Sequence, residues 1–204
     1  MFDNALVASR TTLICVVLVL AVSCGSTAPS SNGAASSPPV AAASPSASTI
    51  PVPALTGKFT SPTMGYSVKY PAGWTITLAT QSWPLGHTSY WDTPDGDRLE
   101  GDGAGFRGTS QALAPGQSTA EWINQYIASS LPCGKREQVP VANEVGTIDL
   151  NDCTGMGRLG GRVFDIAVVS GGRGYNFTME GRVDRGFFLA MLATVTFSSQ
   201  DAKA

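Results

Sequence analysis

The sequence predicts one α+β domain, a curved antiparallel β-sheet with helices packed on it, over residues 58–199. Short segments of alternating apolar and polar residues are separated by turns that contain glycine or proline, as is typical of antiparallel strands. Two other segments, 119–130 and 187–192, place apolar residues at helical spacing. Because strands come in groups and do not alternate one by one with helices, the order favours α+β over α/β.

The first half of the domain supplies two predicted strands, an irregular segment and a helix. Residues 66–70 and 74–78 alternate between apolar and polar side chains, and Pro71-Ala72-Gly73 between them predicts a tight turn. Residues 87–102 are acidic and irregular, and 104–107 is a short predicted strand. Ser118 and Glu121 have the spacing of a capping box, which predicts a helix over 119–130.

The second half predicts more strands, then a helix and a final strand. Strands are indicated at 136–141 and 145–150. Residues 163–168 and 175–180 alternate, and Ser170-Gly171-Gly172 between them predicts a β-hairpin. The apolar face of 187–192 predicts a second helix, and 194–197 a last strand.

The N-terminus has the pattern of an export signal. Thr11 to Val22 is apolar or nearly so, about half the length needed to cross a bilayer but right for the core of a signal peptide. It leads to Leu20-Ala21-Val22-Ser23-Cys24, which resembles the lipobox of bacterial lipoproteins. The resemblance implies removal of residues 1–23 and a diacylglycerol thioether on Cys24, with anchoring at the extracytoplasmic face of the cell membrane. An ordinary secretory peptide or an uncleaved anchor is the alternative.

Residues 24–57 are predicted to be the lipidated cysteine and a disordered linker. No residue after Arg10 is charged until Lys58, and the stretch 25–57 has no aromatic residue. Its Ser, Ala, Pro and Gly cannot bury enough apolar area to offset the entropy of ordering. Residues 200–204 are predicted to be a C-terminal tail.

Several short motifs of the domain resemble Mog1/PsbP-like domains. The motifs near the start of the domain are Phe59, Gly65-Tyr66-Ser67-Val68, Tyr70-Pro71 and Gly73-Trp74. Those near its end are Gly174-Tyr175, Phe187-Phe188, Met191-Leu192-Ala193-Thr194 and Phe197. The resemblance covers about two-thirds of the chain and includes actinobacterial cell-envelope lipoproteins. It implies an α/β/α sandwich. It implies little about function, because such domains range from a photosystem II subunit to a Ran-binding nuclear factor.

Two cysteines remain once Cys15 leaves with the signal peptide and Cys24 carries lipid. Cys133 and Cys153 form an even pair in an exported chain, which favours a disulfide. Two free thiols or a metal site are the alternatives. Zinc is disfavoured because a site needs about four ligands and His87 is the sole histidine.

Two sets of side chains are candidates for binding. An irregular stretch is flanked by Trp83, Tyr90 and Trp91. Aromatic rings exposed there could stack on a sugar or hold an acyl chain, and core packing is the alternative for at least one of them. The second set is a run of carboxylates that fits either a weak calcium site or a solvated loop. Its members are Asp92, Asp95, Asp97, Glu100 and Asp102.

Enzymatic motifs are weak. Gly155 to Gly160 satisfies G-x-G-x-x-G, but 162–169 alternates like a strand, whereas dinucleotide binding requires a helix there. No G-x-S-x-G motif occurs, and we expect no cofactor. A net charge of −2 with scattered basic residues argues against nucleic acid. The sequence therefore predicts a non-catalytic, membrane-anchored envelope lipoprotein whose domain binds a partner protein or envelope ligand. The rival is a hydrolytic or metal-dependent envelope enzyme that uses residues 92–102.

Overall fold

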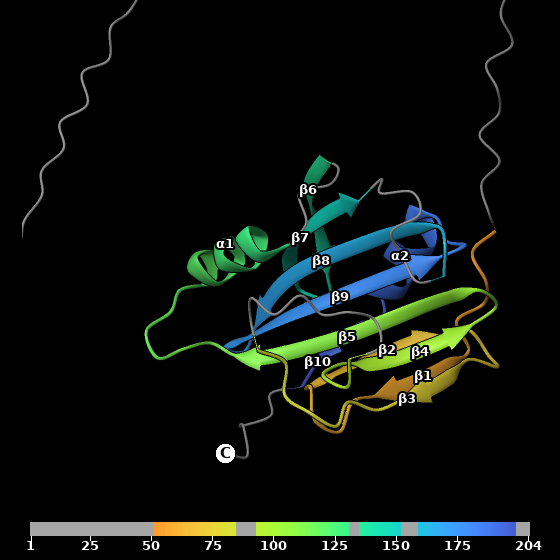
Figure 1. Cartoon of the computed structure of the whole chain (residues 1–204), viewed down its shortest axis with the longest axis horizontal. Helices are drawn as coiled ribbons and strands as arrows, with labels where there is room; N and C mark the ends of the chain where they lie inside the picture. The colour runs from red at the N-terminus through yellow and green to blue at the C-terminus, as the bar shows by residue number, and fades with distance from the viewer. Residues whose placement is uncertain (1–50, 85–92, 131–134, 152–158, 199–204) are drawn as a thin grey trace, which may run out of the picture. The chain divides into compact units, whose positions relative to one another are not determined.

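The computed structural model describes residues 51–84, 93–130, 135–151 and 159–198 (Figure 1). These residues form ten strands in two antiparallel sheets, with two helices packed against them. The predicted α+β class is confirmed. Within the described residues no helix is long and apolar enough to span a membrane.

The two sheets differ in size. The small sheet has the order β1-β2-β10 and contains β1 (Gly57–Thr60), β2 (Tyr66–Tyr70) and β10 (Thr196–Phe197). The large sheet has the order β3-β4-β5-β9-β8-β7-β6 and contains β3 (Thr75–Thr77), β4 (Asp97–Gly101), β5 (Ala104–Ala112), β6 (Lys135–Val141), β7 (Glu144–Asn151), β8 (Arg162–Ser170) and β9 (Arg173–Gly181). The helices are α1 (Thr119–Ser129) and α2 (Arg185–Leu192).

The main core lies between the large sheet and a layer made of the small sheet and α2. Phe177 of β9 meets Tyr66 of the small sheet edge to face, with ring centroids 5.2 Å apart. On the same face, Phe164 of β8 stacks on Phe188 of α2 at 5.9 Å. Burial of such rings contributes most of the hydrophobic stabilisation of a core.

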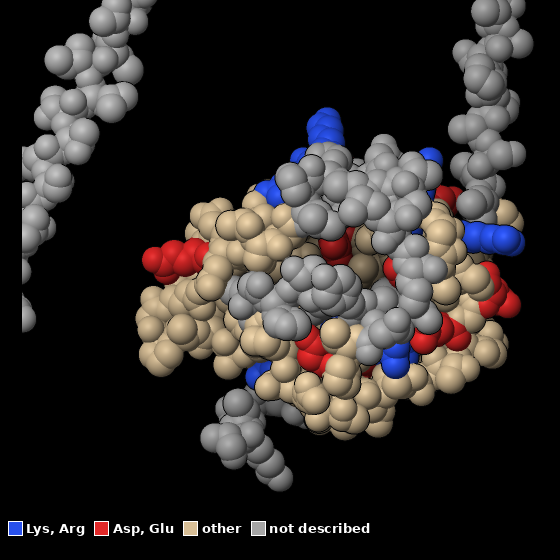
Figure 2. All heavy atoms as spheres, in the orientation of Figure 1, with Lys and Arg blue, Asp and Glu red and all other residues tan. Residues whose placement is uncertain are grey.

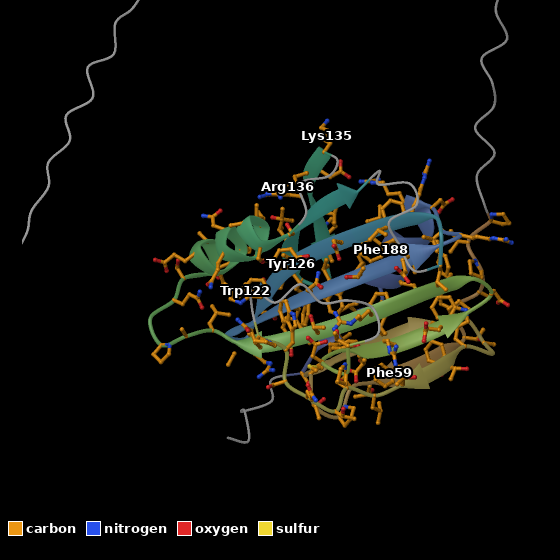
Figure 3. All side chains as sticks on the ribbon, in the orientation of Figure 1. Phe59, Trp122, Tyr126, Lys135, Arg136 and Phe188 are labelled. Atoms are coloured by element: carbon orange, nitrogen blue, oxygen red, sulfur yellow. The ribbon has the colours of Figure 1, made fainter. Side chains whose placement is uncertain are left out.

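Helix α1 covers the other face of the large sheet. Its Trp122 and Tyr126 are buried, and their rings stack at 6.0 Å (Figure 3). Trp122 lies over Gly174 of β9, whose neighbour Tyr175 points to the opposite face because successive strand residues alternate. The large sheet is thus covered on both faces, by α1 on one and by α2 with the small sheet on the other.

The capping box predicted for α1 is confirmed. The Ser118 backbone N–H donates to Glu121 Oε2 at 2.8 Å, and the Glu121 N–H donates to Ser118 Oγ at 3.2 Å. Two of the N–H groups that a helix start leaves without intrahelical partners are satisfied in this way. The pKa of the Glu121 carboxyl is lowered by two hydrogen bonds that it accepts from Ser118, one from the backbone N–H and one from the side-chain hydroxyl at 2.8 Å.

Replacing Ser118 by alanine is expected to lower the free energy of unfolding by about 1 kcal/mol, because an N-cap acceptor is lost. Urea denaturation of the purified protein measures the change. The matched control is Thr119→Ala, one residue further on and also exposed, which we expect to change stability by less than about 0.5 kcal/mol. Equal effects of the two substitutions would show that the cap is not a source of stability.

The predicted β8–β9 hairpin is confirmed, with Ser170 opposite Arg173 at its end. Gly171 and Gly172 both have positive φ, +56° and +75°. This is the combination that a two-residue type I′ turn requires, and its twist matches that of the flanking strands. The pair of glycines after an alternating segment was therefore a sufficient signal.

The two strands predicted on either side of the tight turn at 71–73 are present, but they do not pair with each other. β2 pairs with β1 and β10, whereas β3 pairs with β4 in the large sheet. The turn at Gly73, with φ +81°, carries the chain from one sheet to the other. β3 is the edge strand of the large sheet, and its apolar residue Ile76 is 38% exposed. Its apolar and polar residues alternate, but the apolar side is not buried in the core.

Two unpredicted strands and one strand boundary also differ from prediction. β1 was not predicted, and β4 lies inside the segment predicted to be irregular. β5 continues to Ala112, beyond the predicted end at 107. The reason is that its residues Arg107, Thr109 and Ser110 are polar yet buried, so hydropathy does not alternate along the strand.

Candidate ligand-binding site

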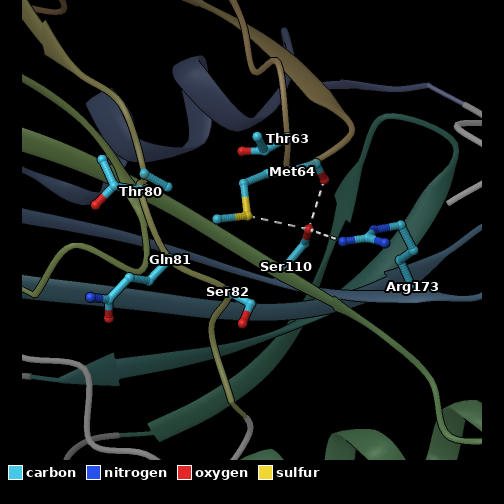
Figure 4. Close-up of a pocket in the computed structure, with 8 residues that line it drawn as sticks. Thr63, Met64, Thr80, Gln81, Ser82, Ser110 and Arg173 are labelled. Carbon is cyan, nitrogen blue, oxygen red and sulfur yellow. Dashed lines mark hydrogen bonds between the residues drawn. The ribbon is translucent and has the colours of Figure 1, made fainter. Parts of the chain in front are cut away.

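A pocket of about 320 Å³ opens where the loop before β2 and the segment after β3 meet one end of the large sheet (Figure 4). This corresponds to the liquid volume of about ten water molecules and lies at the small end of ligand sites. Its described lining residues are Thr63, Met64, Ala79, Thr80, Gln81, Ser82, Ser110 and Arg173. Met64 and Ser110 are buried and Arg173 is half-buried, and we call these three the floor. Thr63, Thr80, Gln81 and Ser82 are exposed and form the rim.

The sheet brings the polar residues of the floor together. Ser110 of β5 lies opposite Tyr175 of β9, and Arg173 is two residues from Tyr175 on the same face. Ser110 and Arg173 are therefore diagonal neighbours on adjacent strands, within reach of a long side chain. Figure 4 shows the Arg173 guanidinium extending from β9 toward the Ser110 hydroxyl.

A short chain of hydrogen bonds fixes the floor. Arg173 Nη2 donates to Ser110 Oγ at 2.9 Å, and Ser110 Oγ donates to the Met64 carbonyl at 2.7 Å. The Met64 N–H in turn donates to Ser61 Oγ at 2.9 Å. Ser110 thus uses its one proton on Met64 and accepts from Arg173, which sets the direction of both bonds.

The charge of Arg173 has no carboxylate partner within the described residues. Its Nε is buried and has no hydrogen-bond acceptor there either. The nearby Tyr175 hydroxyl donates to the Gly65 carbonyl at 3.2 Å. Burial raises the pKa of Tyr175, and the positive charge of Arg173 offsets part of that increase. A half-buried guanidinium of this kind is available to an anionic ligand.

The rim is held by contacts from β4 and the residues before it. The Ala79 N–H donates to Asp97 Oδ1 at 2.9 Å, and the N–H groups of Thr80 and Gln81 donate to the Pro94 carbonyl at 2.8 and 3.1 Å. These bonds fix the backbone on this side of the pocket before any ligand binds. A preformed site loses less entropy on binding than one that must be ordered.

Asp97 faces the core side of the sheet, where Tyr66 lies. The Asp97 side chain is fully buried, and Tyr66 is packed against Gly108, the residue opposite Asp97. Burial, and then the Asp97 charge, raise the pKa of the Tyr66 hydroxyl well above its usual range. Asp97 thus lies beside Tyr66 and also accepts the Ala79 N–H, which fixes the adjoining rim.

A buried ion pair lies on the opposite face of the large sheet. Arg107 Nη2 donates to Asp95 Oδ1, and Thr93 Oγ1 donates to the same oxygen at 2.6 Å. Arg107 is 2% exposed. Burial lowers the pKa of its guanidinium, while the charges of Asp95 and Asp165 act in the other direction. Nothing in this pair is open to a ligand, and its consequence is for stability.

The predicted acidic cluster does not converge in the described part of the chain. Asp95 is bound to Arg107 on one face of the sheet and Asp97 faces the other. Asp102 lies in the exposed turn between β4 and β5, with φ +54°. No group of three or more potential metal ligands occurs among the described residues. Glu100 alternates with Leu99 of the core, and Asp92 lies outside the described residues.

Of the three predicted aromatic ligand-binding residues, the structure describes one, and it is a core residue. Trp83 is 4% exposed and packs edge to face on Trp122 and Tyr126, with centroids 6.2 and 6.4 Å apart. The alternative of core packing is correct for this ring, because α1 needs apolar partners above the sheet. Tyr90 and Trp91 lie outside the described residues.

Other predicted features also lie outside the described residues. These are the lipidation site Cys24, the cysteines Cys133 and Cys153, His87 and most of the Gly155–Gly160 motif. The segment after that motif is strand β8 and not a helix, as its alternation predicts. The geometry for dinucleotide binding is therefore missing from this part of the described chain.

Arg173, Ser110 and the rim were not predicted as a site. The sequence places Arg173 directly after the hairpin glycines, a position typical of an exposed turn flank. Only the pairing of β5 with β9 brings it to Ser110. Basic side chains elsewhere do not gather: on the face shown in Figure 2, Lys and Arg of the described residues are scattered among Asp and Glu.

The structure thus defines a class: an α+β domain of two antiparallel sheets with a small arginine-floored pocket. No family model and no curated protein matches the chain. Among solved structures, one from Bacteroides thetaiotaomicron VPI-5482 is similar, with 11% sequence identity and a TM-score of 0.42. The similarity covers 72% of this chain and 50% of that one, so the chain spans half the length of that protein.

Proposed function

We propose that this chain is an exported, lipid-anchored envelope protein whose domain is a non-catalytic module that binds a small envelope ligand in the Arg173 pocket. The pocket carries the proposal. Its lining offers one fixed cation, an amide and several hydroxyls, which are groups for recognising a polar ligand. The eight described lining residues include no carboxylate, imidazole or thiol to exchange a proton or attack a substrate.

The anchoring part of the proposal depends on the N-terminal sequence. The apolar run Thr11 to Val22 and the cysteine at Cys24 fit lipoprotein processing, and the uncharged stretch 25–57 suits a tether. Two or more acyl chains hold a protein at a membrane durably, since each buried CH₂ contributes about 0.8 kcal/mol. A domain held in this way meets ligands of the extracytoplasmic space.

The rival function, a hydrolytic or metal-dependent enzyme using residues 92–102, has less support. Such an enzyme needs two carboxylates that converge in a concave site. In the described part of this segment, Asp95 is held by Arg107 and Asp97 by the Ala79 N–H on the other face. Asp95 lies in the turn before β4 and Asp97 is the first residue of that strand, so the bend between them separates the carboxylates that the chemistry would need to bring together.

Anchoring is tested by metabolic labelling with a palmitate analogue in a bacterial host that processes lipoproteins. The wild-type chain is expected to be labelled and found in the membrane fraction, and Cys24→Ala is expected to lose the label. Cys15→Ala is the matched control, because Cys15 lies in the segment predicted to be removed, and it should keep the label. An unlabelled wild-type chain, or a labelled Cys24→Ala chain, would overturn the anchoring.

A further inference from the structure

We infer that the Arg173 pocket recognises a small hydroxylated carboxylate, whose carboxylate pairs with Arg173 on the floor while its hydroxyls meet the rim. The inference deepens the proposed function, since it names the chemical class of ligand for the same pocket. Its basis is that one pocket combines a cation without a carboxylate partner among the described residues with exposed residues that carry a hydroxyl or an amide.

The first step concerns charge. Removing a cation from water costs free energy unless an opposite charge or hydrogen bonds replace the water. Arg107 shows how this chain meets that cost elsewhere, with Asp95 against its guanidinium. Arg173 lies against neutral hydroxyls instead, those of Ser110 and Tyr175, and its Nε is buried without an acceptor in the described structure. An anion in the pocket would supply the missing counter-charge.

The second step concerns which anion. A guanidinium is planar, and its parallel N–H donors match the two oxygens of a carboxylate. A phosphate carries up to two charges and is usually held by several cations or by a run of backbone N–H groups. Arg173 is the sole charged residue among the described lining residues. One fixed positive charge therefore suits a monocarboxylate better than a phosphate.

The third step concerns the rest of the ligand. Thr63, Thr80 and Ser82 each have a hydroxyl that can donate and accept, and Gln81 adds an amide. All four are exposed at the rim, above the buried Met64 and Ser110. A ligand with hydroxyl groups beyond its carboxylate would satisfy both levels, and the volume of about 320 Å³ restricts it to a small molecule.

The test uses gluconate as the probe and sorbitol as its neutral counterpart, because the two differ only in the carboxylate. The full chain, purified in a non-ionic detergent, is titrated by calorimetry at constant ionic strength. Gluconate is expected to bind saturably and sorbitol at least about tenfold more weakly, as the loss of a hydrogen-bonded charge pair implies. Inorganic phosphate, the third arm, is expected to bind more weakly than gluconate.

Variants connect the binding to Arg173. Arg173→Gln should weaken gluconate binding by at least about tenfold, and Arg173→Lys, which keeps the charge but loses the planar fork, by a smaller factor. Arg162→Gln is the matched control, because Arg162 is an exposed arginine of β8 outside the pocket lining. The melting temperature of each ligand-free variant establishes that it is folded.

Several results would overturn the inference: no saturable gluconate binding to the wild-type chain, sorbitol or phosphate binding as tightly as gluconate, or equal gluconate affinity in Arg173→Gln. These failures are separate from failure of the anchoring. If the chain is never lipidated but binds gluconate through Arg173, the proposed anchoring is wrong and the carboxylate site stands. If the chain is lipidated but does not bind gluconate, the carboxylate site is wrong and the anchoring stands.

Discussion

Replacing Arg107 by alanine is expected to lower the free energy of unfolding by about 3–5 kcal/mol, because the buried Asp95 carboxylate loses the positive charge that compensates it. The side chains of Arg107 and Asp95 are only 2% and 6% exposed. Water cannot replace the guanidinium at such a site without opening the structure. Since domains of this size are stable by about 5–15 kcal/mol in total, urea denaturation should show a large shift of the midpoint.

The double variant Arg107→Leu with Asp95→Leu is the control for this prediction. Apolar residues in place of a buried ion pair are often neutral or stabilising, so we expect the double variant to be more stable than Arg107→Ala. Thr93, which donates to Asp95 in the wild type, would then lose one acceptor at a small further cost. A cost below about 1 kcal/mol for Arg107→Ala would show that the pair is hydrated in solution.

The fold was predictable where one face of an element is apolar and the other polar. The capping box of Ser118 and Glu121 and the two glycines of the β8–β9 hairpin are local signals, and both were correct. β5 was predicted too short because Arg107 and Thr109 face a buried polar layer. Buried polar residues remove the periodicity on which prediction from one sequence depends.

Strand pairing was less predictable, because pairing depends on contacts between distant segments. Residues on both sides of Gly73 have strand patterns, and adjacent strands usually pair. The structure instead pairs β2 with β1 and β10, and β3 with β4. β10 brings Thr196 opposite Ser67, far away in the sequence, and no local pattern records that contact.

The pocket was not predictable for a related reason. Arg173 and Ser110 are ordinary residue types whose hydrogen bond exists only because β5 lies beside β9. Trp83 shows the opposite error. Its residue type suggested ligand binding, but its ring packs against Trp122 of α1 and belongs to the core. Residue type alone says little about a site, whereas an unpaired charge beside a cavity is visible only in three dimensions.

Trp122→Ala is expected to lower the free energy of unfolding by about 3–5 kcal/mol, the range for removing a large buried aromatic side chain. Trp122 is fully buried between Tyr126, Trp83 and the backbone of Gly174. Its loss removes the contact of α1 with Gly174 of β9 and leaves a cavity. Urea denaturation monitored by circular dichroism measures the change, and the exposed Ile76→Ala on edge strand β3 is the control.

Gly174→Ala tests the same contact from the side of the sheet. A Cβ at residue 174 would lie 2.0 Å from Trp122 Cε2, so the ring or the strand must move, at a cost of about 1–3 kcal/mol. In the Trp122→Ala background the space is free, and the same Gly174→Ala change should cost little or add stability. Equal costs in the two backgrounds would show that Trp122 does not pack against β9, and α1 would then have to cover the sheet in another way.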